Sequence, residues 1–174
     1  MKHDVCIVGG CGHVGLPLAI TFAEAGLNTL ILDKNEKALD NVLSGRMPFL
    51  EKDAPEKLKK VLKEKMLSGT TNNSAVSESK YVIIIIGTPI DEFLNPKVQN
   101  IQNVFEDLIP YFKAGQTIIL RSTIYPGTTR AMHKLLIKRK NEQLPKGISV
   151  NIEGGVVNVR DGNPLPFELI AQFE

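Results

Sequence analysis

The chain contains little of what marks several common classes of protein. Its 174 residues include only two cysteines, which form no disulfide framework, so we expect a reducing, cytoplasmic setting. The formal net charge is only +2, which gives no argument for a nucleic-acid partner. No apolar run is long enough to span a membrane, and the N-terminus lacks a signal-peptide pattern. With 43% hydrophobic and 23% charged residues, the composition is that of an ordinary globular domain.

The N-terminal segment joins a short apolar strand to a glycine-rich turn. The run at residues 5–8 leads into Gly10, Gly12 and Gly15, whose spacing fits G-x-G-x-x-G. An apolar helical pattern comes next, and a second apolar strand then ends at Asp33. This order of strand, turn, helix and strand predicts a site for a dinucleotide. The alternative is a glycine-rich turn without a ligand, which does not account for an acid at this distance.

Each glycine has its own expected task. Gly10 permits a tight turn out of the strand, Gly12 lets the backbone approach a pyrophosphate, and Gly15 lets the helix pack close to the strand. The free N–H groups at the start of the helix then face the phosphates, where the helix dipole favours negative charge. The Asp33 carboxylate accepts hydrogen bonds from a ribose 2′-hydroxyl and repels a 2′-phosphate. We therefore expect NAD rather than NADP, although the neighbouring Lys34 softens that repulsion.

Strand and helix patterns alternate along the rest of the chain. Asp53 and Glu56 are expected to form a capping box at the start of a helix. The clearest strand, residues 81–86, is apolar on both faces, as in the middle of a parallel sheet covered by helices. The pattern predicts a Rossmann-type α/β domain, a doubly wound parallel sheet of about six strands, over residues 1–152. The expected helices are 34–43, 54–66, 74–79, 101–112 and 128–140, and the further strands are 67–71, 116–121 and 148–152.

Ligands of such sheets bind beyond the carboxyl ends of the strands, so the residues just past strand ends are candidates for the site. They are Gly10 to Val14, Asp33, Thr88, Pro89, Ser122 and Thr123. By themselves, Thr88 is only a turn residue and Thr123 only a helix N-cap. Cys6 is expected to be a core residue of the first strand. Cys11 lies in the glycine turn, where a functional thiol is the less favoured alternative. We expect no metal site.

Four segments together resemble one family of enzymes. They are residues 10–19, 44–51, 87–92 and 122–129, the last with the pattern Ser-Thr-x-x-Pro-Gly-Thr-Thr. Their order and spacing are similar to those of the UDP-glucose/GDP-mannose dehydrogenase family, over roughly residues 4–150. Members of that family oxidise the C6 alcohol of a nucleotide-linked sugar to a carboxylate and reduce two NAD⁺, in polysaccharide biosynthesis.

The resemblance implies an NAD-dependent dehydrogenase and assigns roles to matching positions. Asp33 would hold the adenosine ribose, and Thr88 and Pro89 would line the cofactor groove. Thr123 would act in catalysis by positioning water or a proton relay near the nicotinamide, and would also contact the cofactor. The pyrophosphate would be held by the residues of the turn: Gly10, Cys11, Gly12, His13 and Val14.

The chain departs from the family pattern at three of these positions. Cys11 and His13 stand where the family commonly has Leu and Tyr, and Arg121 stands where many members have Glu. The His13 ring would either lie over the cofactor or only shield the turn. Residues 88–96 and 125–127 resemble the members that act on UDP-N-acetylhexosamines more than those that act on UDP-glucose.

The largest departure is at the end of the chain. Residues 151–155 do not match the family's Pro-Glu-Arg stretch, so residues 153–174 are expected to be a tail outside the family pattern. The chain holds neither the catalytic Cys and Lys nor the sugar-binding domain that follow in the family, and Cys6 and Cys11 are in the wrong place to replace that nucleophile. We therefore expect NAD binding without sugar oxidation by this chain alone. The chain is then a fragment, a truncated gene product or a stand-alone cofactor domain.

Three interpretations of the function stay open. The first is the cofactor domain of a dehydrogenase whose nucleotide-sugar substrate binds to a missing C-terminal domain. The second is a non-enzymatic module that responds to NAD. The third is another Rossmann enzyme, of the hydroxyacid or methyltransferase type, against which Asp33 and the two Thr-containing motifs argue. Family members commonly dimerise through the missing linking helix, so a homo-oligomer is an open expectation.

Overall fold

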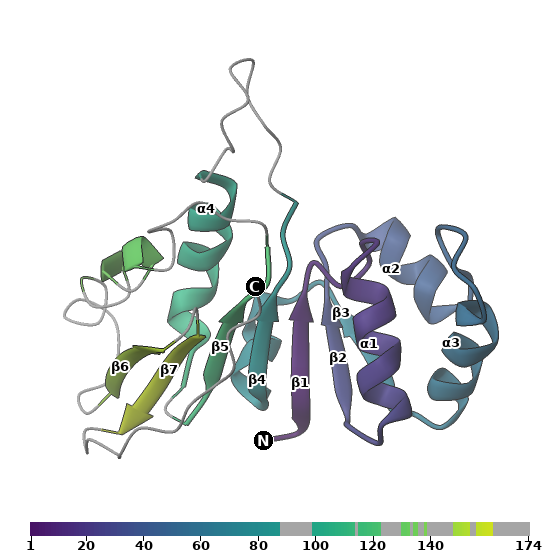
Figure 1. The fold of residues 1–174 in the computed structure, drawn as a ribbon, viewed down its shortest axis with the longest axis horizontal. Helices are drawn as coiled ribbons and strands as arrows, with labels where there is room; N and C mark the ends of the chain where they lie inside the picture. Colours follow the sequence, from purple (N-terminus) through teal and green to yellow (C-terminus); the bar gives the residue numbers. More distant parts are fainter. Residues whose placement is uncertain are drawn as a thin grey trace. The chain divides into compact units, whose positions relative to one another are not determined.

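A computed structural model describes residues 1–87, 99–113, 115–122, 130–132, 134–135, 138, 148–153 and 156–161. The chain divides into two units, residues 1–85 and residues 86–174. Strands and helices alternate along the first unit (Figure 1), as the sequence predicts.

Four parallel strands form the sheet of the first unit. In spatial order they are β3 (Leu67–Thr70), β2 (Thr29–Leu32), β1 (His3–Val8) and β4 (Ser79–Ile84). The register places Cys6 of β1 opposite Leu30 on one side and Val82 on the other. The residues of β2 are all buried, and so are the last three residues of β4. Burial on both faces explains the continuous apolar runs, because helices cover parallel sheets on both sides.

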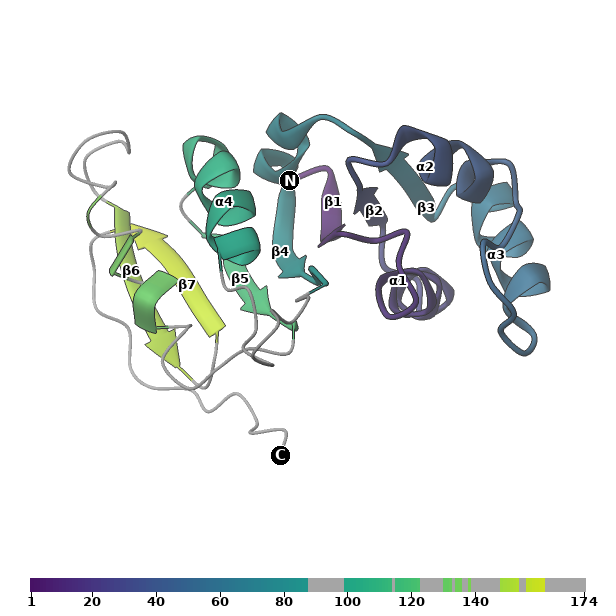
Figure 2. The same cartoon turned by 90° about the horizontal axis from the view of Figure 1, so that it is seen from above.

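The connections between these strands cover the two faces of the sheet. The helix α1 (Gly15–Glu24) and the 3-10 helix η1 (Asn73–Glu78) lie on opposite faces (Figure 2). The helix α3 (Ala54–Lys63) packs against α1. Both helices bury an apolar stripe, which consists of Leu16, Ala19, Ile20 and Ala23 in α1 and Leu58 and Val61 in α3. This spacing of three and four residues is why the sequence folds as helix here.

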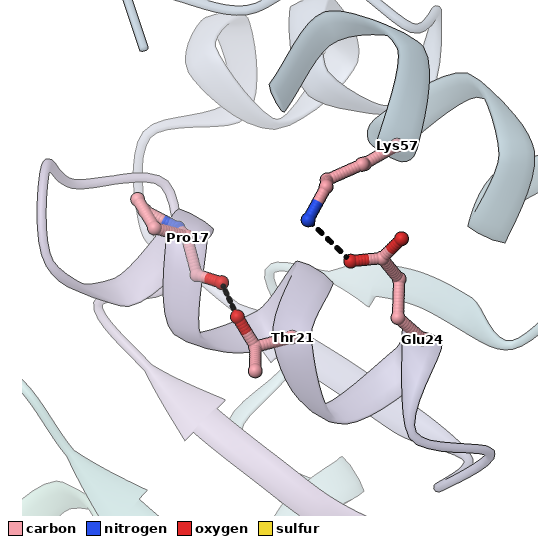
Figure 3. A network of polar contacts seen from close by, with 4 residues as sticks. All are labelled: Pro17, Thr21, Glu24 and Lys57. Atoms are coloured by element: carbon pink, nitrogen blue, oxygen red, sulfur yellow. Dashed lines mark hydrogen bonds and ion pairs between the residues drawn. The ribbon is translucent and has the colours of Figure 1, made fainter. Parts of the chain in front are cut away.

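Polar contacts at the surface of α1 add to this packing. The Nζ of Lys57 in α3 lies 3.1 Å from a carboxylate oxygen of Glu24 (Figure 3). An exposed ion pair of this kind contributes at most about 1 kcal/mol, so the apolar contacts dominate. The hydroxyl of Thr21 donates a 2.9 Å hydrogen bond to the carbonyl of Pro17, one turn earlier in the same helix (Figure 3).

The starts of α2 and α3 differ. The helix α2 (Glu36–Leu43) follows Asn35, whose Oδ1 accepts the N–H of Ala38 at 3.1 Å. The Asp53 side chain makes no such bond to α3, so the expected capping box is wrong in its Asp53 half. The backbone of Asp53 is left-handed, with φ of 60°. A capping side chain needs the extended backbone of an N-cap residue, which Asp53 does not have.

The second unit contains the helix α4 and an antiparallel group of strands. Its elements are α4 (Gln99–Leu108), the 3-10 helix η2 (Ile109–Tyr111), β5 (Thr117–Leu120), β6 (Ile148–Glu153) and β7 (Val156–Asp161). The rings of Phe105 and Phe112 are buried with their centroids 5.7 Å apart. β7 pairs antiparallel with both β5 and β6. β6 thus occupies the expected last strand without extending the parallel sheet, and β7 lies in the segment expected to be a tail.

The fold class follows from the first unit. Its succession of strand, helix and strand with parallel pairing is the Rossmann arrangement, so the predicted α/β fold is confirmed. The helix expected at 128–140 and the tail 162–174 lie largely or wholly outside the described residues. Among the helices that the structure describes, none has the length and apolar character needed to cross a bilayer.

Candidate cofactor site

A short turn joins β1 to α1 (Figure 1). Its glycines are needed for different reasons. Gly9, rather than Gly10, has the left-handed backbone that turns the chain, with φ of 78°. Its N–H donates a 2.8 Å hydrogen bond to the carbonyl of Leu32 at the end of β2. Gly10 is needed for a different reason, because a Cβ there would lie 2.8 Å from Cγ2 of Ile31 and 2.9 Å from the carbonyl oxygen of Ile7. The tight turn expected at Gly10 therefore belongs to Gly9.

Gly15 and Gly12 differ in why glycine is needed: Gly15 allows close packing, and Gly12 leaves space for a ligand. A Cβ on Gly15 would lie 2.6 Å from the carbonyl oxygen of Gly9 and 2.8 Å from the Cα of Gly10. The close approach of α1 to the turn that the sequence predicts is therefore present. A Cβ on Gly12 would meet only the carbonyl oxygen of Gly9, at an ordinary 3.5 Å. The fold does not itself need glycine at position 12, which is exposed, so the space above it is open to a ligand.

No side chain satisfies the first turn of α1. Val14 precedes the helix and cannot cap it, and the first turn holds no acidic residue. The neighbouring helix α2 has both, since Asn35 caps it and Glu36 lies in its first turn. The N–H of Leu16 already donates to the carbonyl of Gly12, and Pro17 has no N–H, so it is the positive end of the α1 dipole that suits a negatively charged ligand group.

Asp33 is joined directly to the glycine turn. Its Oδ2 accepts the backbone N–H of Cys11 at 2.9 Å, and its Oδ1 accepts the N–H of Asn35 at 3.0 Å. The N–H of Asp33 itself donates to the carbonyl of Thr70 at the end of β3. A carboxylate has about four acceptor positions, so a half-buried group held by backbone donors keeps capacity for ligand hydroxyls. The sequence predicts the turn and Asp33 as separate candidates beyond strand ends, and the structure brings them together.

Both cysteine thiols are unreactive in this environment. Burial raises the pKa of the Cys11 thiol to about 12, and the charge of Asp33 and a hydrogen bond with its side chain act in the same direction. Burial also raises the pKa of Cys6 to about 12, opposed in part by a hydrogen bond with Ser79. Thiolates are the nucleophilic form of cysteine, so neither residue provides a nucleophile near neutral pH.

His13 has a partner that the sequence did not predict. Its ring stacks on the ring of Phe49, with centroids 4.2 Å apart and an angle of 18° between the planes. Phe49 comes from the loop between α2 and α3, which the sequence had singled out only for its resemblance to the family segment at residues 44–51. A single aromatic residue in the loop before a helix is the one local sign that such a contact exists.

The second half of the expected site is described only in part. The N–H of Ile86 donates a 2.8 Å hydrogen bond to Oγ of Ser122, so the segments that follow β4 and β5 meet there. Arg121 is exposed beside it. Thr88, Pro89 and Thr123 lie outside the described residues. Within the described part of the chain, no group of His, Cys, Asp and Glu side chains is arranged to hold a metal ion.

The arrangement is suited to binding a dinucleotide. The open space at Gly12 and the positive end of α1 suit a pyrophosphate, and the carboxylate of Asp33, which is held by backbone donors, offers acceptors to a ribose. Neither Cys6 nor Cys11 has the properties of a nucleophile.

Comparison with known proteins also indicates a site for a dinucleotide. The model of the NAD-binding domain of the UDP-glucose/GDP-mannose dehydrogenase family matches residues 3–164. A Bacillus subtilis protein with the provisional name UDP-glucose 6-dehydrogenase is 31% identical over 92% of this chain and 36% of its own length. The UDP-N-acetyl-D-glucosamine 6-dehydrogenase of Pseudomonas aeruginosa is 34% identical over 74% of the chain and 29% of its own length.

A solved structure agrees with these relatives. The UDP-D-ManNAc dehydrogenase of Pyrococcus horikoshii aligns with a TM-score of 0.74 and 27% identity, over 80% of this chain and 33% of the other. The chain thus spans about a third of the length of the relatives that it matches.

Proposed function

Because the chain belongs to the UDP-glucose/GDP-mannose dehydrogenase family, as its NAD-binding domain, we propose that it supplies the cofactor half of an enzyme that oxidises the C6 alcohol of a nucleotide sugar to a uronate. The overall change converts the alcohol, water and two NAD⁺ into the carboxylate, two NADH and three H⁺. The observation that supports the proposal is the hydrogen bond of 2.9 Å between Cys11 N–H and Asp33, which joins the glycine turn to the carboxylate at the end of β2.

In this proposal the turn residues Gly10, Cys11, Gly12, His13 and Val14 hold the pyrophosphate and Asp33 holds the adenosine ribose. The uncapped start of α1 and the open space at Gly12 support the first role. The backbone donors that fix Asp33 support the second, because they orient the carboxylate without exhausting its acceptors. Bound NAD⁺ would supply the hydride acceptor.

Roles near the nicotinamide are proposed for residues beyond the described part of the site. Thr88 and Pro89 would line the cofactor groove, and Thr123 would position water or a proton relay. The hydrogen bond of 2.8 Å between Ile86 N–H and Ser122 Oγ supports this, because it joins the segments that lead to these residues.

We further propose that another polypeptide segment supplies the nucleophile and the sugar site. Covalent oxidation of an aldehyde through a thiol needs a thiolate, and the pKa of each cysteine in this chain is raised to about 12. Relatives about three times as long leave room for a linking helix, through which the enzyme would dimerise, and for a second domain. The two free cysteines fit a cytoplasmic setting.

We favour a UDP-N-acetylhexosamine over UDP-glucose as the substrate. Support comes from the motif at residues 88–96 and from the names of relatives in Pseudomonas aeruginosa and Pyrococcus horikoshii, which act on UDP-N-acetylhexosamines by those names.

A titration of the purified chain tests the proposal. We expect calorimetry to show binding of NAD⁺, weaker binding of NADP⁺ and none of S-adenosylmethionine. A coupled assay for NADH with UDP-glucose and with UDP-N-acetylhexosamines should show no turnover by residues 1–174. Tighter binding of NADP⁺ would contradict the role of Asp33, and robust turnover would contradict the need for a second domain. Binding of NAD⁺ that changes assembly without any link to sugar oxidation would favour a non-enzymatic module.

A further inference from the structure

The loop between α2 and α3 touches the glycine turn through one of two adjacent apolar side chains. Phe49 is half-buried and stacks on the His13 ring, with centroids 4.2 Å apart. Leu50, the next residue, is fully exposed. The loop therefore makes a specific contact with the turn, because the Phe49 ring packs on one partner while the adjacent Leu50 side chain remains in solvent.

The stack restricts the orientation of an otherwise exposed side chain. His13 lies in the open turn and is exposed to solvent, so without a partner its ring would sample several rotamers. A nearly parallel contact, with 18° between the planes, covers one face of the ring. The two ring nitrogens lie on the edge, where they remain free to form hydrogen bonds.

The position of the ring indicates what it is held for. His13 stands between Gly12, which is open, and Gly15, where α1 begins without a side-chain cap. A phosphate bound at this helix end would lie beside the turn. It would then be next to the edge of a His13 ring that is held in place. A ring held there adds one directed donor to the backbone N–H groups.

We propose that Phe49 is a positioning residue of the cofactor site, which holds the His13 ring beside the pyrophosphate of the dinucleotide. The inference rests on the proposed roles of the turn residues and adds a residue 34 positions beyond Gly15 in the sequence. Phe49 does not touch the phosphates in this account. It restricts the rotamers of the His13 side chain before the ligand binds, which lowers the conformational entropy cost of binding.

Substitutions at two adjacent positions test the role of the stack. Phe49→Leu keeps an apolar side chain but loses the ring, and Phe49→Tyr keeps the ring. Leu50→Ala is the matched control on the same loop, because Leu50 is fully exposed. We expect Phe49→Leu to weaken binding of both NAD⁺ and ADP-ribose by about two- to tenfold in calorimetry, as the loss of one aromatic contact predicts. Phe49→Tyr and Leu50→Ala should bind like the parent chain.

A double-mutant cycle separates positioning from general support of the loop. If Phe49 acts through His13, then His13→Ala alone weakens binding, and adding Phe49→Leu has no further effect. Additive losses, an equal loss in Leu50→Ala, or unchanged binding in Phe49→Leu would each overturn the inference. Failure of the parent chain to bind NAD⁺ would instead refute the proposed site, so the two failures are distinguishable. Circular dichroism melts confirm that each variant is folded before its titration is interpreted.

Discussion

The backbone N–H of Cys11 donates a hydrogen bond of 2.9 Å to Oδ2 of Asp33, across 22 positions of the sequence. The bond couples the two halves of the candidate site, because the turn cannot move away from the end of β2 without losing a charge-assisted contact. It also fixes the carboxylate before any ligand arrives, which lowers the ordering cost of binding. Any backbone N–H would suffice, so the contact does not depend on cysteine at position 11.

Replacing Asp33 tests the ribose contact and the preference between cofactors. Asp33→Asn keeps the size of the side chain and one oxygen acceptor but removes the charge. We expect NAD⁺ to bind about 10- to 100-fold more weakly, because hydrogen bonds to a charged group are worth about 1.5–3 kcal/mol. Binding of NADP⁺ should fall less or rise, because the repulsion of its 2′-phosphate is gone. Paired calorimetric titrations measure both, and an unchanged ratio of the two affinities would rule out Asp33 as the selector.

The same variant has a second readout that needs no cofactor. Asp33 raises the pKa of the Cys11 thiol by its charge and by a hydrogen bond, in addition to the effect of burial. Asp33→Asn should lower that pKa, and alkylation of Cys11 by iodoacetamide at pH 8 should become faster. Cys6 is the internal control, because its pKa does not depend on Asp33. Mass spectrometry of the two peptides would show equal rates in parent and variant if the thiol and the carboxylate did not interact.

The same substitution at two glycines of the turn should affect different properties, stability at Gly15 and NAD⁺ affinity at Gly12. Gly15→Ala places a Cβ 2.6 Å from the carbonyl oxygen of Gly9, so we expect a loss of about 1–3 kcal/mol in the free energy of unfolding. Gly12→Ala meets only an ordinary contact of 3.5 Å, so its stability should change by less than about 0.5 kcal/mol. Its NAD⁺ affinity should nevertheless fall by about tenfold or more, because the methyl group occupies the approach of the pyrophosphate.

Urea unfolding and calorimetry on the same two proteins decide the matter. A stable Gly12→Ala variant with the affinity of the parent chain would show that the pyrophosphate does not approach position 12. A Gly15→Ala variant with the stability of the parent would show that α1 can shift away from the turn at little cost.

Local patterns predicted the parts of the fold that depend on neighbours in sequence. The run from β1 through α1 to Asp33 is confirmed because an apolar strand, a glycine turn and an apolar helix stripe are all short-range signals. Asp53 shows the limit of such signals. Aspartate favours both an N-cap and a left-handed backbone, and here the second preference wins, with φ of 60°.

The site depends more on contacts between distant residues. The meeting of Asp33 with the turn could be predicted, because a motif specifies the distance between them. The stack of Phe49 on His13 could not, since it depends on how a loop folds back over 36 residues. The crowding at Gly10 is in part a tertiary effect, since one close contact is the side chain of Ile31 in β2 and another is the carbonyl oxygen of Ile7. Thr88, Pro89 and Thr123 stay predictions.

The end of α3 offers a direct test of backbone strain. Lys65 follows the helix with a left-handed φ of 58°, and its N–H and that of Met66 donate to the carbonyls of Leu62 and Val61. Glycine keeps these bonds and removes the clash of a Cβ, which costs an L-residue about 1–2 kcal/mol, against about 0.5–1 kcal/mol of added chain entropy. Lys65→Gly should therefore stabilise the chain by about 0.5–1 kcal/mol. Lys60→Gly, at an exposed position inside the same helix, is the control and should destabilise the chain by about 1 kcal/mol. Equal effects in thermal melts would contradict the strain argument.

Cys6 predicts a specific loss of stability in alkali. Burial raises its pKa from an ordinary 9.0 to about 12, so between these values the unfolded chain releases a proton that the folded chain keeps. The unfolded state then binds fewer protons, and the free energy of unfolding falls with pH by about 1.4 kcal/mol per unit for this one group. The stabilising effect is complete below pH 9 and is lost progressively as the pH approaches 12.

Cys6→Ala isolates this loss, because the other titrating groups are common to both chains and cancel in the difference. Removal of the sulfur from a fully buried site should make the variant less stable at pH 7, by an amount that does not depend on its titration. We expect that deficit to shrink between pH 9 and pH 11, because only the parent chain carries the Cys6 proton. Urea unfolding under reducing conditions at pH 7, 9, 10 and 11 measures the difference. A deficit that stays constant over that range would mean that the thiol ionises as readily in the folded chain as in the unfolded one.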